Sequence, residues 1–162
     1  MKVRDVMTNM ALRCRPEANL GLATELMWKG DCGFLPVVDH EQRVVGVVTD
    51  RDICIALGTR GVPAGDVRVA EVMSREVCFC SPGDDIHAAL QTMRRGRVHR
   101  LPVLTDAGKL AGVISIDDIL LRTNLLSSNE TPEISSKEII ETAQAIDMQH
   151  LPQIGRKQRF IA

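Results

Sequence analysis

The chain has 162 residues, of which 44% are hydrophobic and 25% are charged, as in an ordinary globular protein. This length suffices for one large domain or two small ones with a real core. The formal net charge of −1 and an aromatic content of 2% argue against a nucleic-acid binder, which needs basic surface and stacking rings. The apolar runs are too short to cross a membrane, and residues 1–5 begin no apolar signal segment. We therefore expect a cytoplasmic protein without nucleic-acid or membrane partners.

The first predicted helix follows Pro16. Leu20, Ala23 and Met27 lie on one face of a helix, since their spacing follows its period of 3.6 residues. Gly30 comes just after this apolar stripe, and glycine commonly ends helices.

Two strands and a second helix are predicted next. Residues 34–38 and 44–48 are short apolar runs rich in β-branched residues, and residues 39–43 between them are typical of a hairpin turn. Pro36 favours an edge position or a strand start, because proline has no backbone N–H to donate. A helix is expected from Asp50 to about residue 57.

Residues 67–119 repeat residues 1–53 without a gap. In the second copy a helix capped by Asp84 or Asp85 and closed by Gly96 is expected, followed by a second hairpin. Its last helix is expected from Ile116 to about residue 121. The positions identical between the copies are, in the first, Val3, Val6, Met7, Cys14, Pro16, Ala23, Met27, Gly30, Leu35, Pro36, Val37, Gly46, Val47, Asp52 and Ile53. A duplicated β-α-β-β-α unit of the α/β (α+β) class is therefore predicted.

One unit of this size has a thin core, so two units are expected to pack together. The predicted organisation is repeat 1 at residues 1–60, a Gly- and Pro-containing linker at 61–66, repeat 2 at 67–124 and a C-terminal extension at 125–162.

The extension begins with a break at residues 127–132 and ends in a basic stretch at residues 156–160. Between them, Ser135 and Glu138 have the spacing of a capping box, which predicts a short amphipathic helix over residues 136–147. Its expected apolar stripe consists of Ile139, Ile140, Ala143 and Ile146.

The end of the hairpin in each repeat carries the main functional signal. A run that begins with Gly46 or Gly112 reaches a hydroxyl residue, and an aspartate follows three positions later, in the pairs Thr49–Asp52 and Ser115–Asp118. This spacing predicts a strand that leads directly into a capped helix N-terminus. Such a terminus has unpaired N–H groups and a positive dipole end, which suit an anionic ligand. Capping alone also explains the spacing.

These residues resemble a tandem pair of cystathionine-β-synthase (CBS) domains, known as a Bateman module. Three features carry the resemblance, and each occurs twice in the same order: residues 3–8 and 69–74, residues 33–37 and 99–103, and the Gly-x-x-Thr/Ser-x-x-Asp stretches. The resemblance covers residues 1–123 or so, and a free-standing pair of this length is similar to bacterial stress-response CBS proteins. It implies a homodimer of pairs that binds an adenosine-containing ligand between the repeats and regulates a protein partner, whose identity the sequence leaves open.

By the same resemblance, Asp52 and Asp118 accept hydrogen bonds from ribose hydroxyls, while Thr49 and Ser115 contact a phosphate. Adenine is expected in apolar slots beside the first strand of each repeat and the loops before the hairpins. The residues expected there are Leu12, Phe34, Cys78, Phe79 and Pro102. Without the resemblance, Phe79 is better interpreted as a core residue. The expected ligands are AMP, ADP or ATP, with S-adenosylmethionine or NAD as further possibilities and no obligatory cofactor.

Cations near these positions suggest how a phosphate is held. Arg100, with His99 and Arg97 beside it, precedes the second hairpin, whereas the first repeat has Gly33 and Phe34 there, so Arg51 is the candidate cation instead. From this difference, the cleft that contains Ser115, Asp118 and Arg100 is expected to bind the phosphate better. The alternative is that these arginines form only a solvated helix end.

Two other functional classes remain open. The sequence has no nucleophile motif or phosphate-binding glycine loop, so we expect no enzyme activity. One alternative is an assembly subunit that binds partners without nucleotide. The other is a redox or metal sensor built on Cys14, Cys78 and Cys80, although none of the five cysteines has zinc-site spacing and no metal is expected.

Overall fold

The structure is a computed structural model that describes residues 1–126 and 134–148 of the chain. Its helices are α1 (Leu20–Lys29), α2 (Asp50–Arg60), α3 (Ile86–Gly96), α4 (Ile116–Leu126) and α5 (Ser136–Asp147). Its strands are β1 (Thr8–Asn9), β2 (Phe34–Val38), β3 (Val44–Thr49), β4 (Arg100–Leu104) and β5 (Leu110–Ser115), and the 3-10 turns are η1 (Val3–Asp5), η2 (Ala64–Asp66) and η3 (Val69–Glu71). Among these elements, no helix is both long and apolar enough to span a membrane. The break at residues 127–132 and the basic stretch at residues 156–160 lie outside the described residues.

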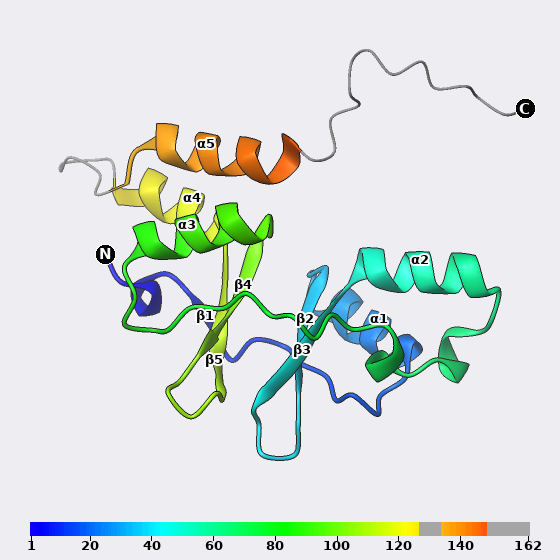
Figure 1. The fold of residues 1–162 in the computed structure, drawn as a ribbon. Coiled ribbons are helices and arrows are strands. Elements are labelled where there is room, and N and C mark those ends of the chain that lie inside the picture. Colours follow the sequence, from blue (N-terminus) through cyan, green and yellow to red (C-terminus); the bar gives the residue numbers. More distant parts are fainter. Residues whose placement is uncertain (127–133, 149–162) are drawn as a thin grey trace, which may run out of the picture.

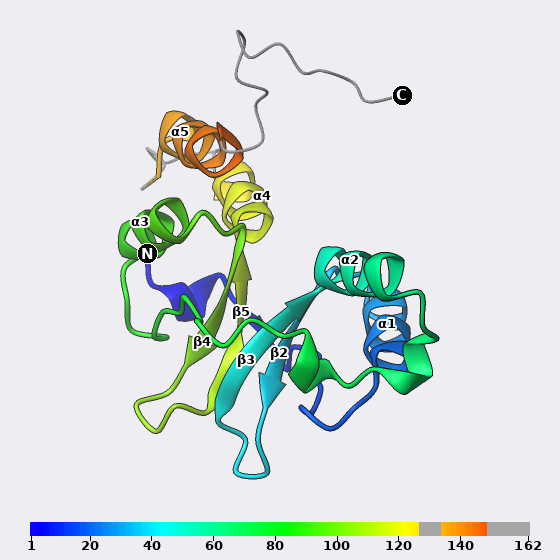
Figure 2. The same cartoon turned by 45° about the vertical axis from the view of Figure 1, so that its right-hand side comes forward.

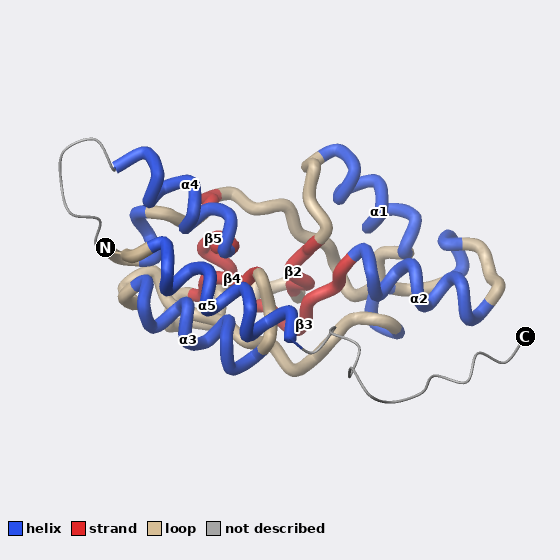
Figure 3. The backbone as a smooth tube through the Cα atoms, turned by 90° about the horizontal axis from the view of Figure 1, so that it is seen from above, coloured by secondary structure: helices blue, strands red, loops and turns tan. Residues whose placement is uncertain are grey.

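The expected architecture of two α/β repeats with a C-terminal helix is confirmed. The β2–β3 hairpin of repeat 1 has its equivalent in the β4–β5 hairpin of repeat 2, and β1 joins the second hairpin as a third strand. Figure 2 shows the two hairpins next to one another, and Figure 3 shows the strands in the middle with helices on either side. Both hairpins have the same register, because Phe34 pairs with Thr49 and Arg100 pairs with Ser115. The residue before each Leu-Pro step therefore lies beside the end of the strand that leads into the helix.

The first strand expected in each repeat, around residues 12–14 and 78–80, is reduced to a single bridge. Only one residue of each pairs, through the parallel bridges of Cys14 with Val37 and of Cys80 with Val103. In contrast, helices α2 and α4 are several residues longer than predicted, and they end at Arg60 and Leu126.

The helices begin at side-chain caps, as their sequences indicate. Asn19 accepts a hydrogen bond from the backbone N–H of Leu22 at 2.9 Å, and Asp85 accepts one from the N–H of His87 at 3.0 Å. Of the two aspartates considered for α3, Asp85 is thus the cap. Asp84 instead accepts from the backbone N–H of Ser81 at 2.7 Å and orders the preceding turn.

Gly96 has a different role from the one predicted. It is the last residue of α3, and the residue that leaves the helix in the left-handed conformation is Arg97, with a φ of 53°. A Cβ atom at Gly96 would lie 2.5 Å from the sulfur of Cys78. Glycine is favoured there because the side chain of Cys78 approaches closely. The helix ends one residue later than expected, where Arg97 takes the left-handed conformation.

The opening segment of each repeat packs into the other repeat. Val3 is buried in the core of repeat 2, where its N–H donates to the carbonyl oxygen of Asp84 at 3.0 Å. Val69 is buried in the core of repeat 1, where its N–H donates to the carbonyl oxygen of Ala18 at 2.8 Å. The predicted boundaries, which start the repeats at residues 1 and 67, follow chain order, whereas packing exchanges these two segments between the repeats.

This exchange explains the glycine that opens each Gly-x-x-Thr/Ser-x-x-Asp stretch. Thr8 of β1 pairs with Val113 of β5, and Ser74 forms the equivalent bridge with Val47 of β3. At Gly46 a Cβ atom would lie 2.8 Å from the carbonyl oxygen of Ser74. The crossing segment therefore requires glycine beside it.

Helix α5 covers the outer face of repeat 2. It packs against α3 and α4, and Figure 1 shows it lying above them. Its buried face consists of Ile139, Thr142 and Ile146, which follow helical spacing. The prediction that Ile140 belongs to the buried stripe is wrong, because its side chain is 55% exposed. Polar contacts fasten both ends, with His87 Nδ1 2.8 Å from Glu138 and His99 Nε2 3.1 Å from Asp147.

Candidate functional site

Thr49 and Asp52 form a complete capping box at the start of α2. The Asp52 Oδ2 atom accepts hydrogen bonds from the Thr49 backbone N–H at 3.0 Å and from the Thr49 hydroxyl at 2.7 Å. The Thr49 hydroxyl in turn accepts from the Asp52 N–H at 3.2 Å. Capping thus occupies one carboxylate oxygen of Asp52, and a carboxylate has a second oxygen with which to accept from a ligand.

Ser115 and Asp118 repeat this geometry at the start of α4. Asp118 Oδ2 accepts from the Ser115 N–H at 2.8 Å and from its hydroxyl at 2.7 Å, and the Ser115 hydroxyl accepts from the Asp118 N–H at 3.0 Å. The capping function of both pairs is confirmed. It holds each carboxylate at a helix N-terminus, where backbone N–H groups and the dipole favour negative charge.

A cleft of about 830 Å³ contains Thr49 and Asp52 and lies between the repeats. We call it the Thr49 cleft. Repeat 1 contributes the β3–α2 junction with Arg51, while repeat 2 contributes Cys78 and the segment from Gly96 to Arg100. The predicted residues that line it are Phe34, Thr49, Arg51, Asp52, Cys78, His99, Arg100 and Pro102.

A second cleft of about 400 Å³ contains Ser115 and Asp118 and is called the Ser115 cleft. Repeat 2 contributes the β5–α4 junction, and repeat 1 contributes residues 8–12 and the segment that follows α1. The predicted residues that line it are Leu12, Phe34, Arg100, Ser115 and Asp118. Arg100 and Phe34 thus border both clefts, and the guanidinium of Arg100 is 3.9 Å from Asp117.

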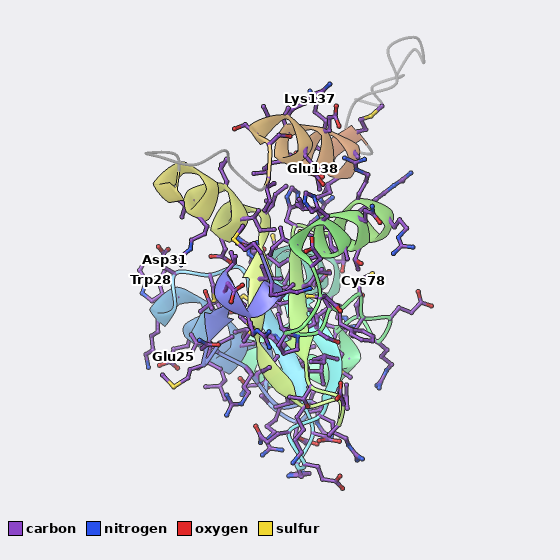
Figure 4. All side chains as sticks on the ribbon, turned by 90° about the vertical axis from the view of Figure 1, so that its left-hand side faces the viewer. Glu25, Trp28, Asp31, Cys78, Lys137 and Glu138 are labelled. Carbon is purple, nitrogen blue, oxygen red and sulfur yellow. The ribbon has the colours of Figure 1, made fainter. Side chains whose placement is uncertain are left out.

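The two clefts open on opposite sides of the molecule. In Figure 4, Asp31, which lines the Ser115 cleft, and Cys78, which lines the Thr49 cleft, lie on opposite flanks. Such a placement is what a pseudo-two-fold relation between the repeats requires, with Phe34 and Arg100 between the two clefts.

Phe79 lies in neither cleft. Its neighbours Cys78 and Cys80 face the interior, whereas the extended chain turns Phe79 outward, and its side chain is 53% exposed. Neither expected role for Phe79, as a base contact or as a core residue, matches this position. Alternation along an extended segment provides the reason, since successive side chains point to opposite sides.

Four charged residues of the clefts were not predicted as ligand contacts: Asp31 and Asp117 line the Ser115 cleft, and Asp50 and Glu76 line the Thr49 cleft. Arg97, which the sequence placed beside Arg100 as a candidate cation for the phosphate, lines the Thr49 cleft. Only the packing of the two repeats shows that Arg97 lines the same cleft as Thr49 and Asp52. Motif spacing alone could not have placed Arg97 in that cleft. The usable signal was the ungapped alignment of the repeats, in which Arg97 is the equivalent of Asp31.

The cysteines proposed for a sensor are separated by the fold. Cys14 lies in the core of repeat 1, and Cys80 lies in the core of repeat 2. Burial raises the pKa of Cys14 to about 11, and burial together with Asp84 raises the pKa of Cys80 to about 12. Both side chains therefore stay as unreactive thiols at neutral pH. In the described part of the chain, no three His, Cys, Asp or Glu side chains gather as a metal site would require.

Comparisons with known proteins agree with this geometry. The sequence model of the CBS domain matches residues 3–59 and 69–123. The CBS domain-containing protein YhcV of Bacillus subtilis is 34% identical over 118 residues, which are 72% of this chain and 81% of that protein. The inosine-5'-monophosphate dehydrogenase of Methanocaldococcus jannaschii is 31% identical over 121 residues, but these span 75% of this chain and only 23% of the enzyme. The likeness to the dehydrogenase therefore concerns part of a larger protein.

Solved structures show the same fold. The CBS domain pair of protein MJ0100, in complex with 5'-methylthioadenosine and S-adenosyl-L-methionine, has a TM-score of 0.70 and 21% identity, covering 76% of this chain and 96% of that chain. The structure of CBSX2 in complex with AMP has a TM-score of 0.68 and 23% identity, covering 77% of this chain and 97% of that one. At identities this low, the structural likeness shows that the fold of the two repeats is shared.

Proposed function

This chain belongs to the CBS domain family as a tandem pair, and on that premise we propose that it is a regulatory module which binds an adenosine-containing ligand. The ligand occupies one or both clefts between the repeats, and a protein partner responds to the resulting change in packing. The observation that carries the proposal is the pair of clefts, each with a carboxylate and a hydroxyl at a helix N-terminus. The MJ0100 and CBSX2 pairs, which bind adenosine ligands, support the choice of ligand class.

The hydroxyl and carboxylate pair of each cleft suits a ribose, and the helix N-terminus beside it adds a positive dipole end. A carboxylate accepts charge-assisted hydrogen bonds from both hydroxyls of a ribose, and a helix N-terminus stabilises negative charge. In the Thr49 cleft, apolar contacts for a base come from residues such as Val47, Val77 and Pro102. We expect micromolar affinity, equivalent to about −8 kcal/mol.

Calorimetry with AMP, ADP, ATP, S-adenosylmethionine and NAD tests the proposal. The informative variants are Asp52→Asn and Asp118→Asn, because asparagine keeps an oxygen that can accept the capping bonds but removes the charge. Loss of charge-assisted bonds should weaken binding roughly 10- to 100-fold in the affected cleft. Asp106→Asn, in the exposed turn between β4 and β5, is the matched control and should bind as the wild type does. The proposal would be overturned if none of the five compounds bound.

A second candidate function is an assembly subunit that acts without nucleotide. It is favoured by the outer face of repeat 1, where Trp28 of α1 is 86% exposed and, with Ile53 and Leu57 of α2, lines a groove of about 550 Å³. The equivalent face of repeat 2 carries α5. Figure 4 shows Trp28 projecting from the surface of α1. We propose that a second copy of the chain covers this face to form a homodimer. The location of the protein in the cytoplasm stays a prediction from the sequence.

A further inference from the structure

The two clefts have opposite charge at two equivalent positions. Alignment of the repeats pairs Arg51 with Asp117 and Arg97 with Asp31. Both arginines line the Thr49 cleft, and both aspartates line the Ser115 cleft. Each cleft therefore has the same hydroxyl and carboxylate pair, but its flanking charges are reversed.

These positions are structurally equivalent as well as aligned. Arg97 and Asp31 both adopt the left-handed conformation just after the first helix of their repeat, with φ values of 53° and 46°. Arg51 and Asp117 both lie in the first turn of the helix that starts at the capping box, one position before Asp52 and Asp118. The backbone thus presents opposite charges from matching places.

The charge balance of the whole lining points the same way. In the Thr49 cleft, Arg51, Arg97 and Arg100 balance three carboxylates, and His99 is a further nitrogen donor. The carboxylates there are Asp50, Asp52 and Glu76. In the Ser115 cleft, three carboxylates face a single cation, Arg100, which lies 3.9 Å from one of them, Asp117. An anionic group entering the Ser115 cleft would meet uncompensated like charge, which disfavours its binding.

We propose that the two clefts bind adenosine-type ligands of different charge. The Thr49 cleft takes the phosphate-bearing ligand, which Arg51 and Arg97 contact. The Ser115 cleft takes an uncharged or cationic one, selected by Asp31 and Asp117 against phosphate. This inference rests on the proposed binding of adenosine compounds, and it reverses the expectation from sequence that Arg100 would make the Ser115 cleft the better phosphate site.

The test uses adenosine compounds that share base and ribose but differ in charge. Adenosine and 5'-methylthioadenosine are neutral, AMP and ATP are anionic, and S-adenosylmethionine is cationic at its sulfonium. Calorimetry on the full chain should show AMP and ATP binding at one site per chain. The variants Arg51→Ala and Arg97→Ala should each weaken AMP binding about 10-fold or more while leaving the binding of neutral and cationic compounds nearly unchanged.

Reversal of the aspartates provides the converse measurement. The double variant Asp31→Arg and Asp117→Arg should gain a second site for AMP and lose affinity for S-adenosylmethionine. Thermal unfolding of each variant, measured without ligand, shows whether it is folded. Should the double variant fail to fold, Asp31→Asn with Asp117→Asn serves instead, since it removes both charges at nearly constant volume and should still improve AMP binding in the second cleft.

The possible outcomes separate this inference from the proposed function. Loss of AMP binding in Asp118→Asn but not in Asp52→Asn would overturn the inference and leave the function standing. The same holds if Arg51→Ala and Arg97→Ala bind AMP as the wild type does. If no adenosine compound of any charge binds to the folded wild type, the proposed function fails, and the inference fails with it.

Discussion

The carbonyl oxygen of Thr8 lies 2.6 Å from the position that a Cβ atom would take at Gly112. This close approach occurs where the opening segment of repeat 1 pairs with β5 of repeat 2. The first glycine of the motif is thus needed for assembly of the two repeats, whereas the hydroxyl and the aspartate that follow it line a cleft.

The first prediction follows from this contact. Gly112→Ala should destabilise the protein by about 1–3 kcal/mol, because the added methyl group overpacks against backbone that cannot rotate away. Gly58→Ala is the matched control, since Gly58 lies inside α2 with no atom within 4 Å of an added Cβ. It should be neutral or stabilising by about 0.5–1 kcal/mol. Urea unfolding of both variants measures the difference, and equal stabilities would contradict the crossed pairing.

A second prediction concerns the packing of α5 against α3 and α4 of repeat 2. Ile146 is 1% exposed and Ile140 is 55% exposed on the same helix. Ile146→Ala should therefore cost about 2–5 kcal/mol, whereas Ile140→Ala should change the free energy of unfolding by no more than about 0.5 kcal/mol. Denaturant unfolding provides the values. A small effect at both positions would mean that α5 does not pack on α3 and α4 in solution.

The third prediction concerns the cysteines and pH. At pH 8, Cys54 is exposed and should react with a thiol reagent, whereas Cys14 and Cys80 should not, because their raised pKa values keep them as thiols. Above a pH of about 9 the unfolded chain releases these protons while the folded chain retains them, so stability should fall as the pH rises toward 11 or 12.

Peptide mapping after brief labelling identifies the reactive thiols, and urea midpoints at pH 8 and pH 10 measure the stability. Cys54→Ser should remove the rapid phase of labelling without changing the pH dependence. Rapid labelling of Cys14 in the folded protein would show that its burial is not maintained in solution.

The fourth prediction addresses the uncovered face of repeat 1. If a second copy covers it, Trp28→Glu should shift the protein toward monomer in sedimentation velocity, since it places a charge in an apolar contact. Phe79→Glu changes another exposed aromatic residue, which lines neither the clefts nor the groove at Trp28, and should leave the sedimentation coefficient unchanged. A wild-type protein that is monomeric at all concentrations would exclude the homodimer.

The fifth prediction links the Thr49 cleft to α5. His99 lines this cleft and also contacts Asp147, at the last turn of α5, with Nε2 3.1 Å from the carboxylate. A phosphate that accepts a hydrogen bond from His99 would compete with Asp147 and repel its charge. AMP should therefore speed amide hydrogen exchange in the last turn of α5. Asp147→Asn should reduce this response, and an unchanged response would mean that the signal follows another route.

Much of the local structure could be predicted from sequence because it depends on residues close together in the chain. Thr49 and Asp52, three positions apart, are enough to form a capping box wherever a helix follows a strand. The same holds for Ser135 at the start of α5, and for the hairpins, whose turns and alternating runs specify antiparallel neighbours. The repeat itself was visible as an ungapped alignment.

The composition of each cleft could not be predicted, because it depends on contacts between segments far apart in the chain. The sequence placed Arg100 with Ser115, and the hairpin register confirms them as neighbours. It could not show that Arg97 reaches the cleft of Thr49, since that follows from the packing of the end of α3 in repeat 2 against the β3–α2 junction of repeat 1.

By itself, the sequence determined that the protein is a duplicated α/β unit whose strands lead into capped helices, because the caps and hairpins are encoded within a few neighbouring residues and the duplication is an ungapped alignment. Only the tertiary structure decided which charges surround each capped helix and which helical face α5 covers. The physical reason is that long-range packing brings Arg51 and Arg97 into one cleft and Asp31 and Asp117 into the other.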